Sequence, residues 1–159
     1  MNARALISRL SLSPHPEGGW YREIYRSPQR VTAPQGSRSA LTSLYYLLER
    51  GQVSRWHVVD ADEVWHFYAG GPLELLAFET GTATLRRRVL AAPTEAPQSE
   101  PVGIIPAGVW QAARTLGDYS LLGCSVAPGF EFADFRLVSD LPGHALHFAG
   151  ALAGLRSLL

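Results

Sequence analysis

Short apolar segments follow one another along this chain at roughly ten-residue spacing, with glycine or proline at most of the joints. About eight or nine such segments can be counted, and several of them alternate between apolar and polar residues as β-strands do. No succession of strands and helices indicates a parallel sheet. The sequence therefore predicts an all-β protein, built as an antiparallel sandwich or a small barrel.

The expected strands lie on both sides of a central hairpin at residues 51–70. They cover residues 20–25, 40–48, 73–79, 83–90, 109–115, 119–126 and 130–138. Residues 3–12 have apolar side chains at helical spacing and predict a short amphipathic helix. Residues 27–39 and 91–101 are expected to be loops. The apolar, alanine-rich tail at 144–159 predicts either a closing helix or a subunit contact, and the whole chain, residues 1–159, is expected to form a single domain.

Composition restricts the possible functions. The chain has 159 residues, 47% of them hydrophobic and 18% charged, with 14 basic and 14 acidic side chains and a formal net charge of zero. This balance argues against nucleic-acid binding, which normally requires a basic surface. No apolar run is long enough to span a membrane. The single cysteine, Cys124, cannot form an internal disulfide and is expected to be an ordinary buried residue. We expect a cytoplasmic protein.

Residues 51–70 carry the most chemistry. His57 ends the first strand of the expected hairpin and Glu63 begins the second, after the acidic turn at 60–62. Side chains in such positions come close across a hairpin and can enter one cavity. An imidazole beside a carboxylate can move a proton or bind a cation. The alternative is that His57 and Glu63 only satisfy each other inside a barrel.

The spacing of this stretch resembles the first signature of the cupins. Gly51, His57, Val59, Glu63 and Gly70 occupy its positions in order, and residues 106–111 (PAGVWQ) resemble the second signature. Further blocks over most of the chain resemble cupin family 5: HPEGGWYRE (15–23), WH (56–57), DEVWHF (62–67), PAGVWQAA (106–113) and VAPGF (126–130). The resemblance implies a double-stranded β-helix, the RmlC-like jelly roll, with short terminal helices and a homodimeric assembly. It implies no settled activity.

Metal-binding cupins hold a metal with histidines and a glutamate at these signature positions. His57 and Glu63 match two of them, whereas Val59 and Gln111 stand where histidines are expected. A stable divalent site usually needs three or four good donors. The resemblance thus implies at most a weakly held divalent metal on His57, Glu63 and Gln111, and leaves a metal-free pocket open.

If the strands pair as in cupins, three inward faces meet in one cavity. These faces carry Arg55 with His57, Glu63 with Trp65 and Phe67, and Gln111. We expect His57 and Glu63 to be catalytic, and Arg55, Trp65, Phe67 and Gln111 to bind a ligand. Arg55 is equally compatible with a place in solvent at the mouth of the cavity.

The resulting hypothesis is a cupin that binds a small, sugar-like or carbonyl-containing molecule and isomerises or epimerises it with His57 as base. Two alternatives stay open: a metal-dependent cupin enzyme such as an oxygenase, and a non-catalytic binding or interaction module. His15 is expected to cap the HPEGG turn, and Tyr21, Glu23 and Tyr25 are expected to line either the pocket or a dimer contact.

Overall fold

The computed structural model describes residues 2–94, 98–140 and 158. Within them one helix, α1 (Ala3–Leu10), is followed almost entirely by strands, which confirms the all-β class and the predicted N-terminal helix. The strands are β1 (Ser13–Pro14), β2 (Trp20–Arg26), β3 (Arg30–Ala33), β4 (Gly36–Ser39), β5 (Thr42–Glu49), β6 (Val53–Val59), β7 (Asp62–Gly70), β8 (Leu73–Glu79), β9 (Thr84–Leu90), β10 (Val102–Ile105), β11 (Trp110–Thr115), β12 (Tyr119–Ala127) and β13 (Phe135–Leu137). Two 3₁₀ turns, η1 (Phe132–Asp134) and η2 (Val138–Asp140), flank β13.

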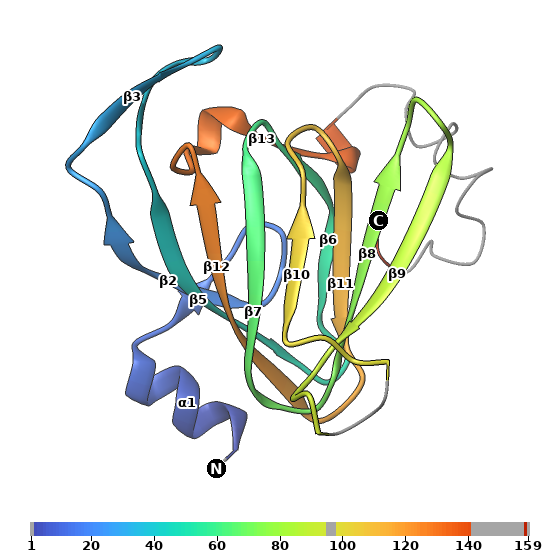
Figure 1. Ribbon diagram of the computed structural model, residues 1–159. Helices are drawn as coiled ribbons and strands as arrows, with labels where there is room; N and C mark the ends of the chain where they lie inside the picture. Colours follow the sequence, from blue (N-terminus) through green and yellow to red (C-terminus); the bar gives the residue numbers. More distant parts are fainter. Residues whose placement is uncertain (1, 95–97, 141–157, 159) are drawn as a thin grey trace.

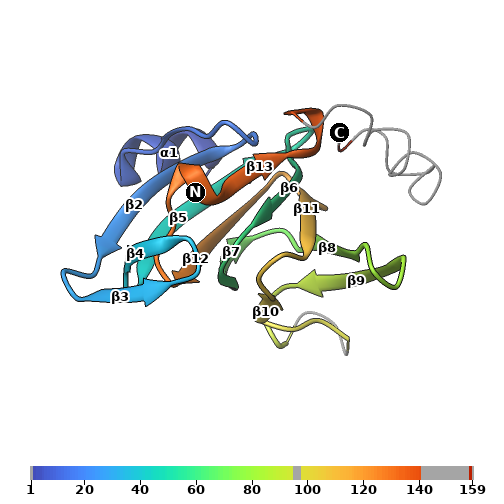
Figure 2. The same ribbon diagram turned by 90° about the horizontal axis from the view of Figure 1, so that it is seen from above.

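The strands form a jelly roll of two antiparallel sheets that lie face to face (Figures 1 and 2). The six-stranded sheet has the order β1-β2-β5-β12-β7-β10, and the five-stranded sheet has the order β13-β6-β11-β8-β9. The predicted pairing of the central hairpin is therefore wrong: β6 belongs to one sheet and β7 to the other, and the two strands do not pair with each other. Because the chain crosses between sheets at this turn, residues near it can meet across the space between the sheets.

Apolar side chains fill the space between the sheets at the end near the β7–β8 turn. Tyr46, Leu48 and Leu122 from the six-stranded sheet pack against Leu73 and Leu75 from the five-stranded sheet. Strand alternation explains which residues take part, since successive side chains point to opposite faces. The other faces are also covered: α1 packs over the six-stranded sheet, and a second apolar cluster lies on the outer face of the five-stranded sheet. The opposite end of the jelly roll, near the β6–β7 turn, contains a cavity.

Two further predicted segments differ from the structure. Residues 27–39, expected to be a loop, form the hairpin β3–β4, whose side chains are mostly exposed and therefore carry no apolar alternation. Residues 130–138, expected to be one strand, instead form η1, the short β13 and η2. The tail at 144–159 lies outside the described residues except for Leu158, which is buried beside Val138.

The β3–β4 hairpin holds η1 in place. Nε and an Nη of Arg38 donate to both carboxylate oxygens of Asp134, at 2.6 and 2.7 Å, and Gln35 donates to the carbonyl of Asp60 in the β6–β7 turn. Both side chains of the Arg38–Asp134 pair are largely buried, so the pair is better shielded from water than a surface ion pair. The hairpin therefore fixes the segment that forms one wall of the cavity.

None of the helices in the described part of the chain has the length and apolar character needed to cross a membrane.

Candidate functional site

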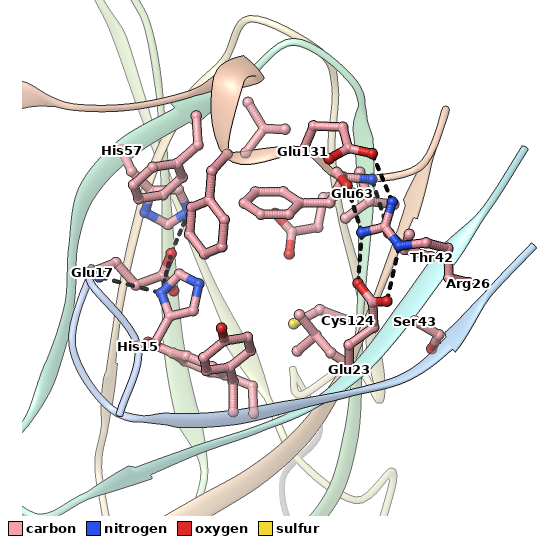
Figure 3. Close-up of a pocket in the computed structure, with 18 residues that line it drawn as sticks. His15, Glu17, Glu23, Arg26, Thr42, Ser43, His57, Glu63, Cys124 and Glu131 are labelled. Carbon is pink, nitrogen blue, oxygen red and sulfur yellow. Dashed lines mark hydrogen bonds and ion pairs between the residues drawn. The ribbon is translucent and has the colours of Figure 1, made fainter. Parts of the chain in front are cut away.

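A cavity of about 300 Å³ lies between the two sheets at the end where η1 and β13 close over them (Figure 3). Its lining comes from the β1–β2 turn, from β2, β5, β6, β7 and β12, and from residues 130–135. The ionisable groups are His15, Glu17, Glu23, Arg26, His57, Glu63, Cys124 and Glu131, and the aromatic walls are Tyr21, Tyr46, Phe130, Phe132 and Phe135. An apolar cavity with a few convergent polar groups is typical of a small-molecule site.

The HPEGG turn places Glu17 in this cavity. Backbone bonds close the turn between His15 and Gly19, and the Tyr46 hydroxyl donates to the carbonyl of Gly18 at 2.7 Å. The amide of Arg55 donates to the carbonyl of Glu17 at 2.9 Å, which attaches the turn to β6. Gly18 has a φ of +113°, and a Cβ there would overlap the carbonyl oxygen of Val53. Only glycine fits this position.

Glu17 and His57 form the central pair of the site. Nδ1 of His57 lies 2.7 Å from the carbonyl oxygen of Arg55, and because a carbonyl only accepts, Nδ1 carries a proton. Nε2 then faces Oε2 of Glu17 at 3.4 Å, and both side chains are almost completely buried. A proton taken up by Nε2 would therefore lie between these two atoms. The hydroxyl of Ser54 donates to the other oxygen of Glu17 at 2.9 Å and fixes its orientation.

His15 is the second imidazole beside Glu17. Its Nδ1 accepts a hydrogen bond from the backbone amide of Glu17 at 3.2 Å, which is the turn-capping role that the sequence predicts. Burial lowers the pKa of His15, opposed by the charge of Glu17 and assisted by that of His57. The ring packs edge-on against Tyr21 and stacks over Phe132. Capping the turn thus also places a neutral imidazole in the cavity wall.

Glu63 is held by a chain of hydrogen bonds that crosses between the sheets. The indole of Trp65, which can only donate, donates to Oε1 of Gln111 at 2.9 Å. This bond orients the Gln111 amide so that its NH₂ group donates to Oε2 of Glu63 at 2.7 Å. Burial raises the pKa of Glu63, while the nearby His57 lowers it, the Glu17 charge raises it again and the bond from Gln111 lowers it. Glu63 therefore favours its protonated form more than an exposed glutamate does.

The raised pKa of Glu63 predicts a stability difference that depends on pH. As pH rises from about 4.5, the unfolded chain loses this proton before the folded protein does, so the burial of Glu63 costs stability over that window. Glu63→Gln keeps the shape and the bond from Gln111 but does not titrate. Relative to the original protein, its free energy of unfolding should increase with pH through the window and then level off. Urea unfolding between about pH 4 and pH 8 measures this. A difference that stays constant with pH, or that also occurs in the remote exposed variant Glu100→Gln, would contradict the assignment.

Cys124 also lines the cavity and is buried. Burial, together with the neighbouring Glu63 and Glu17, raises the pKa of the thiol well above its usual value. A cysteine acts as a nucleophile through its thiolate. The structure confirms that Cys124 is buried, and its raised pKa disfavours the thiolate.

The mouth of the cavity carries one guanidinium between two carboxylates. Arg26 donates from Nε and Nη2 to both oxygens of Glu23, at 2.9 and 2.8 Å, and from Nη1 to Glu131 at 2.8 Å. A further Nη2–H reaches the carbonyl of Phe130 at 3.0 Å. Figure 3 shows this group on the side of the cavity opposite the Glu17–His57 pair. The positive charge of Arg26 is therefore already balanced.

Of the six residues that the sequence assigns to the site, the structure places two in the cavity lining and four outside it. Tyr21 and Glu23, predicted for either the pocket or a dimer contact, also line the cavity. His57 and Glu63 line the cavity, whereas Gln111 and Trp65 lie behind Glu63, buried among core side chains. Phe67 packs against the same core, and Arg55 turns towards the carbonyls of Pro16 and Glu17.

Glu17 is not among the residues predicted from the sequence, and His15 is predicted only to cap the turn. Their signal was the HPEGG turn itself, in which ionisable residues stand next to two glycines.

The donor set does not fit a resident divalent metal. Among the described residues there is no group of three or more histidine, cysteine, aspartate or glutamate side chains arranged to hold one. Val59 offers no donor, and the amide oxygen of Gln111 is occupied by Trp65. Both nitrogens of His57 face protein groups. The weak metal site implied for His57, Glu63 and Gln111 therefore has little support in the geometry.

The chain is similar in sequence and fold to known proteins. A family model described as Cupin superfamily (DUF985) matches residues 4–138. A solved protein from Shewanella oneidensis is 35% identical, with 95% of each chain covered and a TM-score of 0.80. A hypothetical protein from Leishmania major is 31% identical, with 86% of each chain covered and a TM-score of 0.79. An oxalate decarboxylase from Bacillus subtilis is 16% identical, with 91% of this chain and 34% of that chain covered and a TM-score of 0.59, which shows a shared fold. No curated protein matches the chain.

Proposed function

This chain belongs to the family described as Cupin superfamily (DUF985). We propose that it binds a small molecule between its two sheets and moves a proton from one position of that molecule to another. The observation that carries the proposal is the buried Glu17–His57 pair at 3.4 Å, which lines a cavity large enough for a small metabolite. Glu63 is the second polar anchor in the same cavity. A homodimer and a cytoplasmic location remain predictions from the sequence.

In the proposed reaction the Glu17–His57 pair accepts a proton from a carbon next to a carbonyl group of the bound molecule. Nδ1 of His57 is committed to the carbonyl of Arg55, so Nε2 is the nitrogen that takes up the proton. The pair reacts in the form without a proton between Nε2 and Glu17, so the proton from carbon then lies between these two groups, and the Glu17 carboxylate stabilises the imidazolium that forms. Returning the proton to a different position or face gives an isomer or an epimer. Burial excludes most water from the pair, which strengthens its electrostatic interaction.

Hydrogen exchange tests this proposal. The protein is purified, and native mass spectrometry with elemental analysis reports any bound organic mass or metal. That compound, and a panel of small ketones, aldehydes and hydroxyketones, is then incubated with the protein in D₂O and followed by ¹H NMR. Replacement of one carbon-bound hydrogen by deuterium is expected for at least one compound. One tightly bound metal per chain, or binding of compounds without any exchange, would overturn the proton-transfer assignment.

A further inference from the structure

Glu63 is a buried carboxyl group that has no ion-pair partner among the described residues. It is 8% exposed, and one of its oxygens lies 2.7 Å from the neutral amide of Gln111. The thiol of Cys124, which carries no positive charge, lines the same cavity. A buried carboxylate normally requires a cation, because leaving the charge unpaired in a low-dielectric environment is costly. Glu17 differs, since it already has His57 and Ser54 as partners.

The charges that line the cavity are unfavourable for an anion. Glu17, Glu23, Glu63 and Glu131 face it, and the guanidinium of Arg26 is shared between two of them. Burial lowers the pKa of His15, so this imidazole supplies no reliable positive charge, and His57 already faces the carboxylate of Glu17. A ligand carboxylate or phosphate would therefore find no available cationic partner among the described lining residues.

The walls of the same cavity suit a cation on an apolar body. Phe130, Phe132 and Phe135 lie near one another at ring-centroid distances of 5.1 to 6.2 Å, and Phe135 lies 5.4 Å from the His57 ring. Aromatic faces attract cations through their quadrupole and pack well against flat apolar groups. The carboxyl of Glu63 and these rings line one and the same cavity.

We infer that the cavity takes a positively charged small molecule, an ammonium group on an apolar or aromatic body, with Glu63 as the carboxylate that receives the ammonium group. This inference rests on the proposed function and narrows its substrate class to amine-bearing compounds. A bound ammonium would favour the charged form of Glu63, whose pKa is raised by burial in the free protein. An amino ketone or amino amide held in this way could present its acidic C–H to His57, whereas a free amino acid would bring an unpaired carboxylate.

The test uses three probes of nearly equal size: benzylamine, benzyl alcohol and benzoate. Their dissociation constants are measured near pH 7 by calorimetry, and NMR shifts show whether binding occurs at the cavity. Benzylamine is expected to bind about ten-fold or more tightly than benzyl alcohol, and benzoate is expected not to saturate the site. In Glu63→Gln, which keeps the shape of the side chain, the preference for the amine should disappear. The same change at a remote exposed site, Glu100→Gln, should leave the preference unchanged.

Other results would overturn the inference. Benzyl alcohol or benzoate binding in the cavity as tightly as the amine would disprove the charge preference and leave the proposed small-molecule site intact. A preference for benzylamine that persists in Glu63→Gln would disprove the role of that carboxylate. Failure of all three probes to bind in the cavity would count against the inference and against the binding function itself.

Discussion

Glu17→Gln should slow deuterium incorporation into a substrate by about 10²–10⁴-fold, the range typical of a lost general acid–base group. The amide of glutamine can still accept the hydrogen bond from Ser54, so the turn and the cavity should keep their shape. Its NH₂ group would instead donate to Nε2 of His57 and occupy the lone pair that must take the proton. The rate is measured by ¹H NMR in D₂O, with circular dichroism and urea unfolding as evidence that the variant is folded.

A second substitution shows whether Glu17 and His57 act as one unit. His57→Gln should lower the exchange rate by a similar factor, and the double variant should be little slower than either single variant, because residues that act together are not additive. Glu100→Gln, an exposed change far from the cavity, serves as the matched control. Unchanged exchange in Glu17→Gln, or effects of the two substitutions that multiply, would contradict a shared proton.

Gly18→Ala should destabilise the protein by about 2–4 kcal/mol, since it combines an unfavourable backbone conformation with a steric overlap. The φ of +113° at this position disfavours any residue with a Cβ, and the added atom would overlap the backbone oxygen of Val53 in β6. For a chain of this size that loss corresponds to a decrease in Tm of roughly 5–15 °C. Thermal and urea unfolding measure the effect, and ligand binding should weaken because Glu17 follows the displaced turn.

Two other glycines separate the causes of that loss. Gly51 has a φ of +84° with open space around its position, so Gly51→Ala should cost only the backbone term, about 1 kcal/mol. Gly81 has no positive φ, and a Cβ added there would meet no atom within 4 Å, so Gly81→Ala should be nearly neutral. If all three variants lost the same stability, the close approach of the turn to Val53 would not be its cause.

The fold could be predicted because its signals are local. Glycine and proline mark most turns, and strands with one buried face show alternation that survives in the sequence. The hairpin β3–β4 lacked this signal because its side chains are mostly exposed and it is held by polar bonds such as Arg38–Asp134. Residues 130–138 were harder still, since a short strand between two 3₁₀ turns has no period of its own.

The site could be predicted only as far as strand geometry reaches. His57 and Glu63 were found because they lie at the two ends of one turn, which brings them into the same space. The inward direction of Gln111 was also predicted, but its contact with Glu63 depends on an amide orientation that Trp65 sets. Glu17 was missed because it reaches His57 from a turn 40 residues earlier in the chain, and no periodicity reports such a meeting.

The HPEGG turn also bears on how a protein of this kind can change over generations. The turn lies outside the pairs of strands that build the two sheets, yet it supplies Glu17 and His15 to a cavity whose other walls belong to the jelly roll. Substitutions in this turn can therefore change the acid–base groups of the cavity without changing the strands of the jelly roll. Proteins of this kind can therefore acquire different catalytic groups in this turn and still fold, provided that Gly18, where the backbone passes close to β6, is kept.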